Sequence, residues 1–120
     1  MMIASIPIIF KMDEDLRSVE DQRSEVAQIV AFMSLGICTA IVAGSLSIKD
    51  AERRLFNPQV LARLTELELP EALIEIIHLG TELEDVQSLV PDRLSESLAQ
   101  MQAKALAFLN QDIGRSQVAA

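Results

Sequence analysis

The 120-residue sequence contains no tryptophan and no tyrosine, and its four aromatic residues are all phenylalanines. A β-sheet core normally recruits more aromatic and β-branched side chains, so this scarcity argues against a β fold. Half of the residues are nevertheless hydrophobic, which suffices for the aliphatic core of one domain at this length. Composition therefore predicts an all-α, single-domain protein.

Cysteine is also scarce, because Cys38 is the only one in the sequence. One thiol excludes an internal disulfide framework and a multi-cysteine zinc site. It suits a reducing compartment, and we expect a cytoplasmic protein. The four glycines are isolated and fit no phosphate-binding fingerprint, so no nucleotide cofactor is expected.

Basic residues are missing from one segment of the chain. Between Glu66 and Asp92 there are eight acids and no lysine or arginine, whereas the ten acids and ten bases elsewhere cancel. The net charge of −8 is therefore concentrated in this segment. Nucleic-acid binding is disfavoured, because it depends on cationic side chains. A basic protein partner would be attracted, although a solvated face that keeps the protein soluble is the simpler interpretation.

Charge is absent from Val26–Ile48 as well, a run of 23 residues. About 20 apolar residues can cross a bilayer, so a membrane anchor is one interpretation. The following segments, however, have one-sided apolar stripes that need a surface to pack on, such as Leu94, Leu98, Met101, Ala105 and Phe108. We therefore expect a soluble bundle with the apolar helix at its centre and no contact with a membrane.

Local signals divide the chain into five or six helices. The first predicted helix starts near Asp15 or Ser24 and ends at a left-handed Gly44. Later starts are predicted at Ser47, Asn57–Pro58, Leu69–Pro70, Thr81 and Pro91. Gly80 is predicted to stop one helix, and the last is expected to end near Asn110. This gives an apolar N-terminal arm (1–12), a helical domain (13–110) and a polar tail (111–120).

Catalytic chemistry finds little support in the sequence. His78 forms a Glu-x-x-His pattern with Glu75, but a di-iron site needs a second such motif, and no second histidine exists. A single-metal site with these two residues stays open, although one histidine with carboxylates binds weakly. Cys38 with His78 could act as nucleophile and base, but a thiol in the most apolar stretch is normally inert packing. We predict neither a catalytic residue, nor a metal site, nor an enzyme.

The acidic segment holds the candidate binding residues. Two short helices meeting at Gly80 and Thr81 would carry the predicted partner-binding residues Glu71, Glu75, Glu82, Glu84 and Asp85. Like charges on adjacent helix faces repel one another unless a partner compensates them. We expect these side chains to contact a basic protein.

Two stretches, "MSLGICTAIVAGSLSIKDAERRLFNP" and "IIHLGTELEDVQSLVPDRL", resemble a small bacterial family, domain of unknown function 3969. The resemblance covers roughly Val26 to Leu109. It implies a small helical domain of the bacterial cytosol and transfers no catalytic residues.

The favoured hypothesis is a non-catalytic binding protein of the immunity or antitoxin kind, which neutralises a basic toxin or nuclease. The alternative is a structural protein that forms homodimers through its N-terminal arm and the stripe of its last helix. A membrane-anchored protein is the third option.

Overall fold

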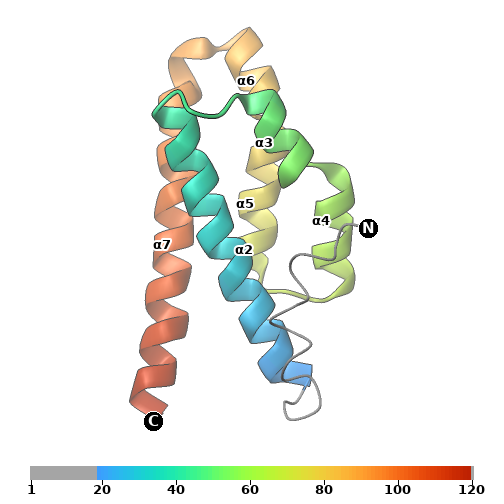
Figure 1. Ribbon diagram of the computed structural model, residues 1–120, viewed down its shortest axis with the longest axis vertical. Helices are drawn as coiled ribbons and strands as arrows, with labels where there is room; N and C mark the ends of the chain where they lie inside the picture. Colours follow the sequence, from blue (N-terminus) through green and yellow to red (C-terminus); the bar gives the residue numbers. More distant parts are fainter. Residues whose placement is uncertain (1–18, 120) are drawn as a thin grey trace.

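A computed structural model describes residues 19–119 (Figure 1). In chain order the elements are α2 (Val19–Val42), α3 (Ile48–Arg54), α4 (Pro58–Glu66), α5 (Glu71–Thr81), α6 (Leu83–Leu89), η2 (Pro91–Arg93) and α7 (Leu94–Ala119). Within these residues there is no strand, which confirms the prediction of an all-α, single-domain bundle. The predicted N-terminal arm, residues 1–12, lies outside the described residues.

The helix starts at Ser47 and Asn57 are formed as the sequence predicts. The Ser47 hydroxyl accepts the backbone N–H of Asp50 at 3.0 Å, and the Asn57 side chain accepts that of Val60 at 2.9 Å. Pro58 occupies the first turn of α4, where its missing N–H costs nothing. Both signals are local in sequence, so the remainder of the fold does not override them.

Two helices end on a residue with left-handed backbone. Gly44 has φ +80° after α2, as predicted, and Glu68 has φ 57° after α4. In each case the next amide donates to a carbonyl five residues earlier, at 2.9 Å after Gly44 and 3.1 Å after Glu68. This is the Schellman pattern, which satisfies carbonyls that a helix end leaves open. At Glu68 the residue with left-handed backbone is not a glycine, so the sequence did not predict this turn.

The predicted stop at Gly80 and the predicted cap at Thr81 are both wrong. Both residues belong to α5, and Glu82 alone separates α5 from α6. The Thr81 hydroxyl donates to the His78 carbonyl at 2.6 Å. Gly80 is present for a different reason: a Cβ built on it would lie 2.6 Å from Cδ1 of Phe56. The glycine lets the Phe56 ring lie directly on the helix backbone.

The predicted end of the last helix near Asn110 is also wrong, because α7 continues to Ala119. Its extension is held against the start of α2. The Asp112 carboxylate accepts hydrogen bonds from the Gln28 amide at 2.6 Å and the Ser24 hydroxyl at 3.3 Å, and Ile113 packs against the core. These contacts, about 85 residues apart in sequence, are not visible in the local composition.

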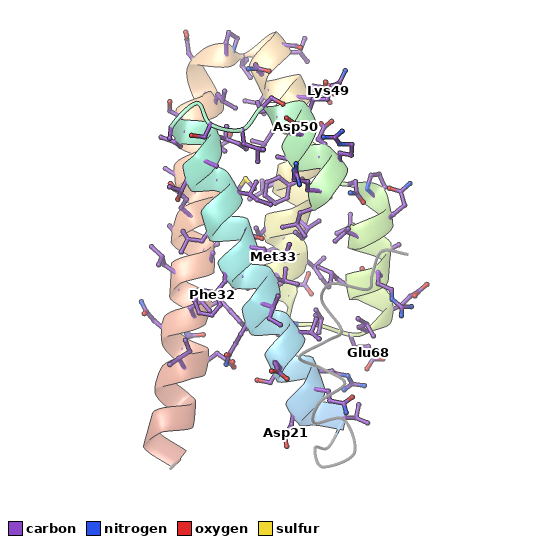
Figure 2. All side chains as sticks on the ribbon, in the orientation of Figure 1. Asp21, Phe32, Met33, Lys49, Asp50 and Glu68 are labelled. Atoms are coloured by element: carbon purple, nitrogen blue, oxygen red, sulfur yellow. The ribbon has the colours of Figure 1, made fainter. Side chains whose placement is uncertain are left out.

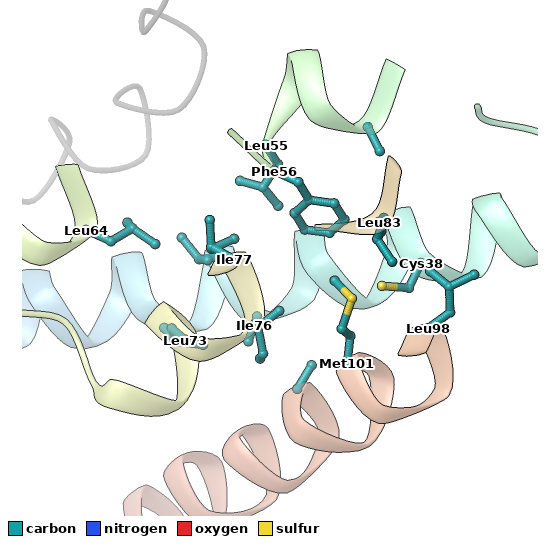
Figure 3. Packing of buried hydrophobic residues seen from close by; sticks show 14 of the residues in the cluster. Cys38, Leu55, Phe56, Leu64, Leu73, Ile76, Ile77, Leu83, Leu98 and Met101 are labelled. Atoms are coloured by element: carbon teal, nitrogen blue, oxygen red, sulfur yellow. The ribbon is translucent and has the colours of Figure 1, made fainter. Parts of the chain in front are cut away.

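The core lies between α2, α5 and α7 and is closed by Phe56 and Leu83 (Figure 3). α5 contributes Leu73, Ile76 and Ile77, all fully buried. α5 is the helix that contacts α2, α4, α6 and α7, so it occupies the central position that we expected of the Val26–Ile48 helix. α2 buries one side and leaves the other open, because it runs along the bundle rather than through it (Figure 1).

Ser34 lies on the buried side of α2 with its hydroxyl oxygen out of contact with solvent and without a hydrogen-bond partner. An unpaired buried hydroxyl costs free energy, and serine is also a poorer helix former than alanine. We expect Ser34→Ala to raise the free energy of unfolding by about 1 kcal/mol, measured by urea denaturation. The partly exposed Ser97→Ala variant, which reports helix propensity alone, should gain less. An equal gain in both would contradict the buried-hydroxyl explanation.

Candidate functional site

Glu84 and Asp85 lie in the first turn of α6, beside α3. Their neighbour is Glu52 of α3, a carboxylate that sequence reasoning missed. Glu52 sits in a short helix that also holds Lys49, Asp50, Arg53 and Arg54, so composition makes its surroundings look balanced. Only the packing of α3 on α6 brings the three acids together.

The pKa of Glu52 is raised above its ordinary value. Burial of the carboxyl group is the largest cause, followed by repulsion from Glu84, with smaller contributions from Asp85 and from a hydrogen bond to Glu84. Lys49 opposes this rise. We call Glu52, Glu84 and Asp85 the carboxylate cluster. Within it, Glu84 and Asp85 each raise the free energy of ionising Glu52.

Glu71 and Glu75 lie elsewhere, on the exposed side of α5. They border an open groove of about 480 Å³ between α4, α5 and α7, whose apolar lining includes Leu61 and Ile74. The Glu75 carboxylate pairs with the Lys104 ammonium of α7 at 3.2 Å. This exposed pair contributes little to stability, but it leaves Glu75 partly neutralised.

The structure therefore divides the predicted partner-binding residues into two groups. Glu71 lies at the start of α5, whereas Glu84 lies in α6, beyond the other end of α5, which is about 16 Å long at 1.5 Å per residue. Glu82 is exposed at the junction between α5 and α6. The acids were expected to act together, but only Glu84 and Asp85 share a neighbour that the structure identifies.

His78 is exposed in the last turn of α5 and borders the groove together with Glu75. Among the side chains that the structure describes, no three histidine, cysteine or acidic groups lie closely enough to hold a metal ion. The Glu75–His78 pattern thus lacks a third ligand among these residues, and Glu75 is already bound to Lys104.

Cys38 is completely buried in α2, and the groove that His78 borders does not include it. Burial raises the pKa of the Cys38 thiol to about 11. Since the thiolate is the reactive form, we expect a maleimide or disulfide reagent at pH 8 to label the native protein only as fast as it unfolds. Labelling in urea provides the control, and complete reaction of the folded protein within minutes would contradict this burial.

One helix in the described part of the chain, Asp21–Val42, is long and apolar enough to cross a membrane, with a mean hydropathy of 1.9. Only 28% of its apolar window is buried. A core helix of a soluble protein passes the same test of length and composition, so this finding alone decides nothing about location.

Fold and site together define a small, acidic, all-α bundle. A family model described as "protein of unknown function (DUF3969)" matches residues 21–118, and the chain belongs to this family. The match extends beyond both ends of the resemblance noted in the sequence. Neither the curated proteins nor the solved structures contain a match.

Proposed function

We propose that this protein is a non-catalytic protein-binding domain of the immunity or antitoxin kind, which neutralises a basic toxin or nuclease through its acidic surface. The observation that carries the proposal is the carboxylate cluster, Glu52, Glu84 and Asp85. Burial and neighbouring acids raise the pKa of Glu52 there. A lysine or arginine of a partner would remove this repulsion on binding, and the energy gained would favour association.

The remaining acids extend the attraction over a wider surface. Glu71, Glu82 and Asp92 are exposed. Together with the cluster they contribute to the negative electrostatic field of a chain with a net charge of −8. Such a field steers a basic protein toward the surface and raises its association rate by roughly 10- to 1,000-fold at low salt. Covering the basic surface of a nuclease would also block its access to nucleic acid.

The test is co-expression with the products of adjacent genes, followed by capture at low and high salt. We expect one basic partner, whose association rate falls about tenfold or more in the Glu84→Lys/Asp85→Lys variant, since both charges steer the encounter. The Glu66→Lys/Glu96→Lys variant changes the net charge equally outside the cluster and should retain binding. Failure to capture any basic partner, or equal losses in both variants, would refute the proposal.

A further inference from the structure

Among the residues that the structure describes, α2 and α7 share a face with exposed apolar side chains. The two helices are joined along this face by two hydrogen bonds: the Gln28 amide donates to Asp112 at 2.6 Å, and the Gln102 amide donates to the Thr39 hydroxyl at 3.1 Å. The two helices run antiparallel here, and both contribute to the surface that lies between the two hydrogen bonds. We call this surface the α2–α7 face.

Large apolar side chains occupy this face. Phe32 follows Gln28 by four residues, and Leu106 follows Gln102 by four, so each lies one turn further along the same side of its helix. Phe32 is 53% exposed and Leu106 47% exposed, and neither belongs to the buried core. Figure 2 shows Phe32 reaching from α2 toward α7. The predicted stripe of α7 is a different side of the helix, since Leu98, Met101 and Ala105 are buried inside the bundle.

Between these two hydrogen bonds the face is free of charge, and the Asp112 carboxylate lies at its end. No residue of α2 after Glu25 is charged, and between Ser97 and Gln111 of α7 the single charged residue is Lys104. Lys104 points to Glu75 of α5, away from α2. Two copies of a chain with a net charge of −8 repel each other over most orientations. Copies related by a two-fold axis through the centre of this face would bring no like charges together there.

The area is sufficient for a weak interface. Two helices packed about 9 Å apart and adjoining over about 17 residues at 1.5 Å each present a face of about 25 Å by 20 Å. Two such faces would bury about 1,000 Å², the lower limit for a specific interface. A dissociation constant in the micromolar range is the corresponding expectation.

We infer that a second copy of this chain covers the α2–α7 face, forming a two-fold homodimer centred on Phe32 and Leu106. The interface leaves the carboxylate cluster free, since that cluster belongs to α3 and α6. The inference is therefore independent of the proposed function, and each can fail without the other.

Gly36 provides the sharpest test. It is exposed, lies one turn after Phe32, and a Cβ built on it meets nothing within 4 Å. Gly36→Arg therefore leaves the folded monomer intact, while it places a bulky cation where the second copy would sit. Its dissociation constant, measured with the full chain by sedimentation equilibrium between about 1 and 200 µM, should rise roughly 30-fold or more.

Ala62→Arg is the matched control, because it adds the same charge at an exposed position of α4 and should leave the dissociation constant unchanged. Leu106→Lys should weaken the dimer as Gly36→Arg does, and circular dichroism verifies that each variant is folded. A wild-type monomer at every concentration would overturn the inference. So would dimerisation that both variants retain, or binding of the wild-type monomer to neutral phosphatidylcholine vesicles that Gly36→Arg weakens.

Discussion

Replacing Gly80 with alanine is expected to lower the free energy of unfolding by about 2–3 kcal/mol, the usual cost of overpacking a core. The added methyl group would lie 2.8 Å from Cβ of Phe56 and 2.6 Å from its Cδ1. Because the Cβ of Phe56 is fixed to the backbone, rotating the ring cannot relieve its contact with the added methyl group. Either α5 or the Leu55–Phe56 turn must move.

Gly36→Ala is the control for this prediction. Both glycines lie inside helices, but Gly36 has open space around it. Its replacement should raise the stability by up to about 1 kcal/mol through helix propensity alone. Urea denaturation followed by circular dichroism measures both. Effects of the same sign would show that the Phe56 ring does not rest on Gly80.

Phe56→Ala is expected to lower the free energy of unfolding by about 4 kcal/mol, the largest effect of any substitution considered. It removes the largest fully buried side chain and leaves a cavity. The Phe56 ring lies among the buried core side chains, beside Leu83 (Figure 3). We expect these neighbours to collapse only partly into the space. Leu89→Ala provides the control: that side chain is 77% exposed and lies outside the α2–α7 face, so its loss should cost no more than about 1 kcal/mol.

The Phe56→Ala/Gly80→Ala double variant connects the two predictions. Once the ring is gone, the methyl group at position 80 fills part of the cavity instead of clashing. The combined cost should therefore be smaller than the sum of the single costs, by at least about 1 kcal/mol. Simple additivity in the urea titrations would contradict a direct contact between these residues.

Sequence reasoning succeeded where the cause is local. Ser47, Asn57 and Gly44 act on atoms within five residues, and each forms the predicted cap or turn. It failed at Gly80, whose role is set by a ring 24 positions earlier, and at Asn110, where contacts with Ser24 and Gln28 extend the helix. In both cases a tertiary contact overrides a correct local propensity.

The same distinction applies to the candidate site. The acidic segment was visible as a run of charges, and it contains two of the three cluster residues. Glu52 could not be found in this way, because nearby bases balance it in sequence while the fold places it beside Glu84. The pairing of Glu75 with Lys104, 29 residues apart, likewise depends on the packing of α5 against α7.

Few contacts hold α6 in place, and this affects local unfolding of the protein. Leu83 is its one buried side chain, and no side chain caps its start. A segment held this weakly opens far more often than the whole protein unfolds, so its amide hydrogens should exchange with solvent well before those of α5. Glu84 and Asp85 belong to α6, so local unfolding of this helix would move them away from Glu52. A partner bound to Glu84 and Asp85 would stabilise the folded form of α6. Slower amide hydrogen exchange across Leu83–Leu89 would therefore report binding directly.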